Sequence, residues 1–167
     1  MSDPAFEVFA RAHNAALFRT ALLMTGDAGL AEDLVQTALA GVFARWSRLS
    51  TQDPYAYARR VIINLHRDRW RRFRGREVLV NQAPERPARS DPAEDSATRH
   101  ALVHALAELS LRERQILVLR FVVDLSEADT ATELGVSVGT VKSTASRALQ
   151  KLRTSRHLDW AFAGETR

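Results

Sequence analysis

Residues 125–153, LSEADTATELGVSVGTVKSTASRALQKLR, decide the fold that we predict for the C-terminal half of this 167-residue chain. A helix-turn-helix needs a small residue where its two helices touch, a residue that tolerates positive φ four positions later, and an apolar residue on the second helix. Ala131, Gly135 and Val141 meet these three requirements at the required offsets. The stretch therefore predicts a short helix, a tight turn and a longer second helix over residues 138–153.

The second helix of this motif carries a polar and basic face. An ordinary helical hairpin is the alternative interpretation, but it gives no reason for such a face, whereas a helix that enters the major groove of DNA requires one. We therefore predict that this helix recognises DNA. The residues that form the face are Thr140, Lys142, Ser143, Ser146, Arg147 and Lys151.

Two segments concentrate positive charge on a chain whose net charge is only +4. Residues 59–76 hold eight arginines against one acidic residue, and residues 137–156 hold five basic residues and no acidic one. Two such segments suggest two separate contacts with a polyanion. A run of charge is usually a solvated face, but a run beside a loop, in a chain that has a second DNA-reading element, favours nucleic-acid binding.

The N-terminal half begins with two predicted helices. Apolar residues recur at helical spacing from the start of the chain, and Gly26 is placed to end the first helix. Asp27 is placed to cap the second helix, whose apolar residues recur every four positions. We expect this second helix to span residues 28–48.

A polar loop and a third helix follow. Residues 47–53 are predicted to form the loop. Asp53 and Pro54 then supply a cap and a first-turn proline for a helix that runs to about Phe73. The apolar face of this helix is expected to end at Leu65, beyond which the sequence is rich in arginine and is expected to be solvated.

Helical periodicity disappears between the two halves of the chain. Residues 75–98 are rich in proline and acidic residues, so we predict a flexible linker there. Residues 110–113 (SLRE) then form a predicted capping box at the start of a further helix. The predicted fold class is therefore all-α, with two small helical domains, residues 1–74 and 99–155, joined by the flexible linker and followed by a tail, residues 156–167.

Composition excludes several classes of protein. The chain has no cysteine, which excludes disulfide scaffolds, thiol catalysis and zinc sites built on cysteine. No run approaches about 18 apolar residues and the first residues do not form a signal peptide, so we expect a soluble cytoplasmic protein. His100 and His104 lie one helical turn apart, but no third ligand sits nearby and no catalytic motif is present. We therefore expect no metal site, no cofactor and no enzyme activity.

The C-terminal half resembles a known kind of DNA-binding domain. Residues 109–115 (LSLRERQ), 134–143 (LGVSVGTVKS) and 147–149 (RAL) resemble the promoter-binding domain of bacterial sigma factors. A similar string occurs in the output domains of LuxR-type regulators, so the N-terminal half has to decide between these two classes.

The N-terminal half favours the sigma factors. Residues 32–36 (EDLVQ), 56–64 (AYARRVIIN) and 68–72 (DRWRR) look like the N-terminal domain of extracytoplasmic-function (ECF) sigma factors, and most of all like the SigE-like subgroup. A LuxR-type regulator would normally place a receiver or ligand-sensing domain with strands here, and no strand is predicted. The resemblance covers roughly residues 5–74 and 99–155, in the order that the family has.

This resemblance implies a sigma factor that binds core RNA polymerase and recognises the −35 and −10 elements of promoter DNA. An anti-sigma factor is a further partner that the family admits. The implied contacts to the −35 element are Thr140, Lys142, Ser143, Ser146 and Arg147. The implied contacts to the melted −10 element, from the third helix and the loop before it, are Gln52, Arg59, Arg60, Asn64, Arg67 and Arg71. Core polymerase is expected to dock on the second helix at Asp33 and Gln36.

Overall fold

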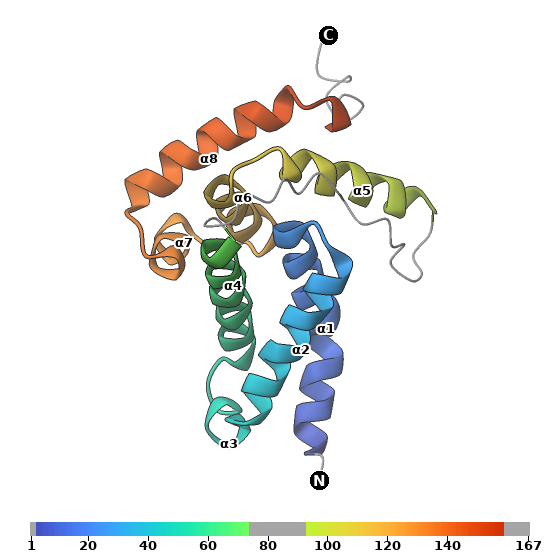
Figure 1. Cartoon of the computed structure of the whole chain (residues 1–167). Coiled ribbons are helices and arrows are strands. Elements are labelled where there is room, and N and C mark those ends of the chain that lie inside the picture. The colour runs from blue at the N-terminus through green and yellow to red at the C-terminus, as the bar shows by residue number, and fades with distance from the viewer. Residues whose placement is uncertain (1–2, 74–92, 159–167) are drawn as a thin grey trace. The chain divides into compact units, whose positions relative to one another are not determined.

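The computed structural model of the chain describes residues 3–73 and 93–158. The chain divides into two compact units, Met1–Arg86 and Pro87–Arg167. Every regular element within the described residues is a helix (Figure 1), which confirms the predicted all-α fold class. None of the helices in these two ranges is long and apolar enough to cross a membrane.

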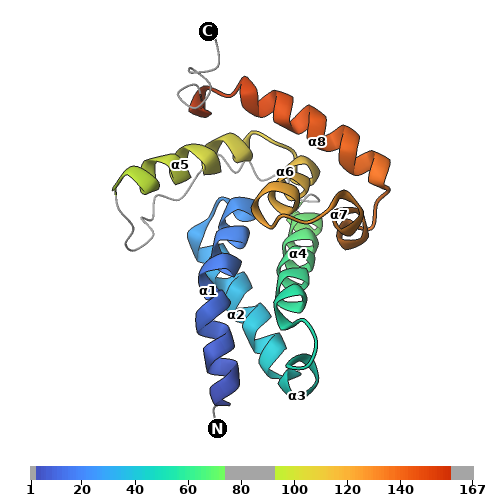
Figure 2. The ribbon, with the colours of Figure 1, turned by 180° about the vertical axis from the view of Figure 1, so that it is seen from behind.

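Within residues 3–73, the first unit consists of three long helices and one short helical turn. Its elements are α1 (Pro4–Thr25), α2 (Ala28–Phe43), α3 (Trp46–Leu49) and α4 (Pro54–Phe73). Helices α1, α2 and α4 lie side by side, and α3 lies in the connection between α2 and α4 (Figures 1 and 2). The core between the helices is built from enclosed side chains that include Leu17, Met24, Val42, Ile62 and Ile63.

Local signals set the ends of these helices as the sequence predicts. Gly26 ends α1 in the left-handed conformation, with a φ of 73°, which a residue without Cβ adopts readily. The Asp27 carboxylate caps α2 by accepting a hydrogen bond from the backbone N–H of Leu30 at 2.9 Å. Asp53 caps α4 in the same way through the backbone N–H of Ala56, at 2.8 Å.

The second helix is shorter than the sequence predicts. Helix α2 ends at Phe43, and part of the loop expected over residues 47–53 is the helical turn α3. The reason lies in tertiary packing, because the break turns Trp46 onto α1, where its ring centroid lies 5.4 Å from that of Phe9. The same turn buries Leu49 in the core, so the loop that remains before α4 is short.

The second unit contains the helix-turn-helix. Its elements are α5 (Ala93–Ala107), α6 (Leu111–Leu117), the π-helical turn η1 (Val118–Val122), α7 (Glu127–Leu134), α8 (Val138–Arg153) and the 3₁₀ turn η2 (Arg156–Leu158). Helices α6 and α7 both pack against α8, and η2 packs against α5. The side chains enclosed within this unit include Ile116, Leu119, Val141 and Ala148.

The helix-turn-helix has the geometry that its sequence predicts. Ala131 of α7 and Val141 of α8 are buried, and the two helices pack on each other. Gly135 ends α7 in the left-handed conformation, with a φ of 64°. The backbone N–H of Val136 donates to the carbonyl of Ala131 at 3.0 Å, a hydrogen bond that is typical of a helix end closed by a left-handed glycine. Ser137 then caps α8, as predicted.

The boundaries of the second unit differ in part from the prediction. Helix α5 begins at Ala93, inside the segment predicted as a linker over residues 75–98. The rest of the predicted linker, residues 75–92, lies outside the described residues, as does the predicted tail beyond Leu158.

Replacing Gly135 with alanine should destabilise the helix-turn-helix. No atom lies within 4 Å of the position that a Cβ would take, but the left-handed backbone strains an alanine by about 1 kcal/mol. Gly139→Ala is the matched control, because a Cβ there meets only the Ser137 hydroxyl oxygen, at 3.9 Å. In the first turn of α8 that change should be neutral or should stabilise by up to about 1 kcal/mol. Urea denaturation measures both free energies of unfolding, and equal values would contradict the predicted strain.

Candidate nucleic-acid interface

Helix α8 has one buried side and one exposed side. The buried side is formed by residues three or four positions apart, namely Val141, Thr144, Ala148 and Leu152. The residues that the sequence assigns to DNA contact are all exposed: Thr140, Lys142, Ser143, Ser146 and Arg147. The helix therefore offers a continuous polar and basic surface to solvent while its other side holds the core together.

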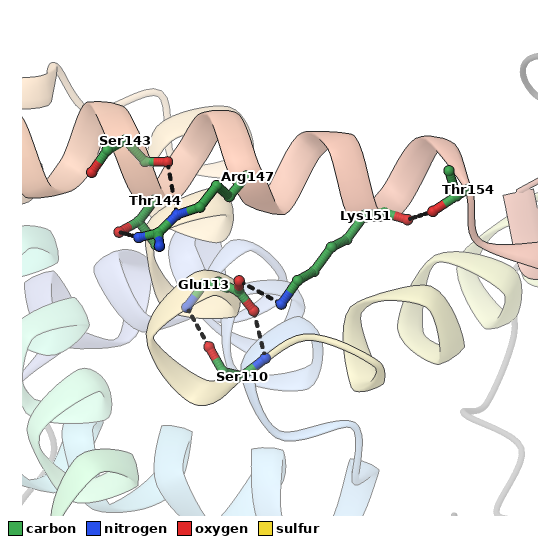
Figure 3. Close-up of polar contacts among 7 residues, drawn as sticks. All are labelled: Ser110, Glu113, Ser143, Thr144, Arg147, Lys151 and Thr154. Atoms are coloured by element: carbon green, nitrogen blue, oxygen red, sulfur yellow. Dashed lines mark hydrogen bonds and ion pairs between the residues drawn. The ribbon is translucent and has the colours of Figure 1, made fainter.

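The basic side chains of this surface make only weak contacts with the residues that the structure describes. The Arg147 Nε donates to the carbonyl of Ser143 at 3.3 Å, and one of its terminal nitrogens donates to the Thr144 hydroxyl at 3.4 Å (Figure 3). The Lys142 Nζ lies 3.5 Å from a carboxylate oxygen of Glu127 on α7. Exposed contacts of this kind contribute little in water, so phosphates or base edges can replace them readily.

Lys151 lies on the same helix, but its side chain bonds a glutamate of the same unit. Its ammonium donates to the Glu113 Oε1 on α6 at 2.7 Å (Figure 3). Glu113 is 8% exposed and also accepts the backbone N–H of Ser110 at 2.9 Å, which completes the predicted capping box of α6. Lys151 therefore joins α8 to α6 and does not add an unpaired charge to the polar face that the sequence suggested.

These contacts lower the pKa of the Glu113 carboxyl below its ordinary value of 4.5. The hydrogen bond from Lys151 is the largest cause, burial acts in the opposite direction, and the hydrogen bonds from Ser110 add to the lowering. Because the pKa is lower in the folded state than in the unfolded state, the ionised carboxylate stabilises the fold at neutral pH. That contribution is lost as the pH falls from the ordinary value through the lowered pKa.

Helix α4 and the loop before it carry the residues assigned to the −10 element. Gln52 in the loop is exposed, as are Arg60 and Arg71 on α4. Asn64 and Arg67 are half-buried one turn apart, and a terminal nitrogen of Arg67 donates to the Asn64 side-chain oxygen at 3.1 Å. This bond places an amide and a guanidinium next to each other on α4.

Arg59 is less exposed than the −10 contact implied by the resemblance would require. It is only 8% exposed, because it stands four residues before the enclosed Ile63 on the inward side of the helix. Its guanidinium lies over the ring of Tyr55, 5.8 Å from the centroid, and is not placed to hold a DNA phosphate. Arg71, in contrast, is exposed and forms an ion pair with Asp68 of the same helix at 2.5 Å.

The residues assigned to polymerase docking lie on the exposed side of α2. Asp33 and Gln36 are both exposed, about one turn apart. Leu34 and Val35, which stand between them in the sequence, are buried in the core of the first unit. A partner can therefore contact the carboxylate and the amide without disturbing the packing of α2.

A cluster of aromatic rings, which the sequence analysis missed, supports the connection before α4. Phe6 and Phe9 of α1 each lie with their ring centroids 5.4 Å from that of Trp46 in α3. His13 extends the cluster to Tyr55 at the start of α4, at 5.0 Å. The rings come from four helices, because the last residue of α2 also lies with its ring centroid 4.9 Å from that of Phe6. The three- and four-residue spacing of the rings along α1 is the only part of the cluster that a single helix reveals, and it does not show the partners on the other helices.

The histidines form no metal centre in the part of the chain that the structure describes. Among the described residues, no group of three or more histidine, aspartate or glutamate side chains could hold a metal ion, so His100 and His104 have no third ligand there. The ring of His104 instead stacks on that of His157, with centroids 5.4 Å apart. This contact links α5 to η2.

The fold and the exposed face of α8 define a two-unit helical DNA-binding protein with a helix-turn-helix. A family model for Sigma-70 region 2 matches residues 9–77, and a model for Sigma-70 region 4 matches residues 99–152. The chain is 40% identical over 158 residues to an RNA polymerase sigma-E factor of Streptomyces coelicolor, which covers 92% of this chain and 89% of that relative. It is 36% identical over 149 residues to the ECF RNA polymerase sigma factor SigL of Mycobacterium tuberculosis, which covers 84% of this chain and 82% of SigL.

Solved structures of similar fold agree with this assignment. The sigma factor RpoE, in complex with the anti-sigma factor NepR from Bartonella quintana, matches with a TM-score of 0.66 and 26% identity over 88% of this chain and 95% of that chain. CnrH, in complex with the cytosolic domain of CnrY, shares the fold with a TM-score of 0.59 and 23% identity over 88% of this chain and 84% of that chain. The chain therefore belongs to the ECF RNA polymerase sigma factors and is SigE-like. It directs promoter-specific initiation of transcription, with core RNA polymerase and promoter DNA as its partners.

Removing one ring of the aromatic cluster should destabilise the first unit. Phe9 is 9% exposed, so Phe9→Ala should lower the free energy of unfolding by about 3 kcal/mol through lost burial and a residual cavity. Val8 is the matched control, because it is 67% exposed and Val8→Ala should change stability by no more than about 0.5 kcal/mol. Denaturant titration followed by circular dichroism compares the two variants. A loss for Phe9→Ala as small as that for Val8→Ala would show that the cluster does not support the unit.

Proposed function

We propose that α8 reads the −35 element in the major groove. The observation that carries this proposal is the division of α8 into a buried apolar side and an exposed polar and basic side. Hydroxyl, ammonium and guanidinium groups on successive turns are the groups that distinguish base edges and hold phosphates. The proposed contacts are Thr140, Lys142, Ser143, Ser146 and Arg147.

A second proposed contact captures the −10 element as a melted single strand. Opening the duplex costs stacking and pairing energy, and a protein recovers it by holding extruded bases while basic side chains follow the backbone. The short loop before α4 and the arginines of α4 supply both kinds of group in one unit. The proposed residues are Gln52, Arg60, Asn64, Arg67 and Arg71, and buried Arg59 is left out of the set.

The proposed docking site for core polymerase is the exposed side of α2 with Asp33 and Gln36. Support comes from their exposure beside a buried core and from the match of this unit to Sigma-70 region 2. We further propose that the chain performs no catalysis of its own, since sigma factors select the promoter and the polymerase forms the phosphodiester bonds. Its place of action is then the cytoplasm, where the polymerase works.

An anti-sigma factor is a further proposed partner. RpoE, which shares 26% identity and the fold of this chain, was solved in complex with the anti-sigma factor NepR. A protein that covers the exposed side of α2 or of α8 would keep this chain from its proposed contacts with the polymerase or with promoter DNA.

Replacing Arg147 with alanine tests the reading of the −35 element. The variant holoenzyme should lose about 1–3 kcal/mol of promoter binding and should relax its preference at one position of the element. The measurement is binding to a library of −35 sequences with a constant −10 element. A uniform loss over all sequences, with a salt slope reduced by about one unit, would instead make Arg147 a phosphate contact.

Replacing Asn64 with alanine tests the capture of melted DNA. Core binding should stay intact, because Asn64 lies on α4 and the docking residues lie on α2, whereas transcription from a duplex promoter should fall sharply. A template with a pre-melted bubble should recover part of the lost activity, since the cost of opening is already met. Full duplex activity with normal −10 preference would make Asn64 a structural residue.

The complementary variant for this experiment is Asp33→Lys. It should weaken binding to core polymerase, so its activity should fall on duplex and bubble templates alike. Thermal melts of both variants separate these outcomes from a general loss of folding. A bubble template that rescued Asp33→Lys would contradict the assignment of α2 as the docking helix.

A further inference from the structure

The sequence contains only two lysines, and both lie on α8. Each faces a glutamate from another helix, but the two pairs differ in geometry. The Lys142 Nζ lies 3.5 Å from Glu127, whose side chain is 38% exposed. The Lys151 Nζ lies 2.7 Å from Glu113, whose side chain is 11% exposed. The first pair is a loose surface contact, and the second is a charge-assisted hydrogen bond to a nearly enclosed carboxylate.

Glu113 has its position fixed independently of Lys151. Its Oε2 accepts the backbone N–H of Ser110 at 2.9 Å, and its own backbone N–H donates to the Ser110 hydroxyl at 3.4 Å. This reciprocal capping box ties the carboxylate to the first turn of α6 (Figure 3). An ammonium that bonds this carboxylate is therefore anchored to α6.

The two ends of α8 are held by different helices. Near its start, buried Val141 and the turn at Gly135 hold α8 against α7. Lys151 lies ten residues further along, which is about 15 Å of helix. Apolar contacts along α8 are non-directional, whereas a hydrogen bond of set length and direction adds a directional constraint at this end of the helix.

We propose that Lys151 is a positioning residue for promoter recognition, which fixes the orientation of α8 on α6 through Glu113 and makes no contact with DNA. The inference rests on the proposed function of α8 as the reader of the −35 element. Loss of the bond would let the exposed face of α8 tilt, so that its side chains no longer meet the base edges in register. The lowered pKa of the Glu113 carboxyl agrees with a bond that persists at neutral pH.

The experiment compares holoenzymes made with variants of the full chain. A promoter selected by the wild-type holoenzyme is tested with its −35 element intact or scrambled, and the ratio of the two affinities is the discrimination. Lys151→Met should lower this discrimination about tenfold, the order of one lost base contact. Lys151→Arg, which keeps the charge and can reach the carboxylate, should restore most of it.

Two further variants test whether Lys151 acts through Glu113. Glu113→Gln keeps a side chain that can complete the capping box but removes the negative charge, and it should lower discrimination as Lys151→Met does. The double variant should be no worse than either single variant, because both changes break the same bond. Glu127→Gln is the matched control at the other lysine's partner, and it should leave discrimination unchanged.

The salt dependence of binding separates positioning from a phosphate contact. A lysine that neutralises a phosphate contributes about 0.9 to the slope of log affinity against log salt concentration. Lys151→Met should leave this slope unchanged. A slope that falls by that amount, with Glu113→Gln behaving as wild type, would overturn the proposal and make Lys151 a DNA contact.

A purely structural role predicts a different result from positioning. It would lower the melting temperature but leave discrimination unchanged at temperatures where each variant is fully folded, and that outcome would also overturn the proposal. A variant with alanine at all five proposed −35 contacts provides the reference for α8 itself. If that variant keeps its discrimination, the proposed function of α8 fails; if it loses discrimination while Lys151→Met does not, only the positioning inference fails.

Discussion

The second unit depends on the burial of one side of α8. Val141, Ala148 and Leu152 are held against α6 and α7, and the helical repeat then forces the residues between them outward. The exposed polar face is thus a geometric consequence of the core. Any substitution that moves the buried side will also move the exposed side that we propose to read DNA, because a helix rotates as one body.

In the first unit, helix α4 is also divided into a buried side and an exposed side, but its buried side includes polar side chains. Helix α4 is rich in arginine, yet Arg59 and His66 are among its buried residues together with Ile62 and Ile63. The guanidinium of Arg59 has an aromatic ring beside it, which lowers the cost of bringing a cation inside. The positive charge that α4 exposes is therefore smaller than its arginine content suggests, and it is concentrated on the outward side.

Sequence reasoning succeeded where a structural feature depends on residues close in the chain. The helix ends at Gly26 and Gly135 and the caps at Asp27 and Asp53 each involve groups within about one helical turn. Sequence reasoning failed where a feature depends on a contact with a residue far away in the sequence. Helix α2 ends early because rings on α1 attract Trp46, and Lys151 finds its carboxylate 38 residues away. Neither contact leaves a periodic signal in the sequence.

The distribution of lysine gives the molecule an unusual chemical property. Every side-chain amine of the chain lies on α8, so an amine-directed acylating reagent modifies the side chains of this helix and no other. The two sites are not equivalent, because the amine of Lys151 must first leave the carboxylate that it bonds at 2.7 Å, whereas that of Lys142 is held at 3.5 Å by an exposed partner. The relative labelling of the two amines therefore reports whether the bond between Lys151 and Glu113 is intact, both in the free chain and in complexes.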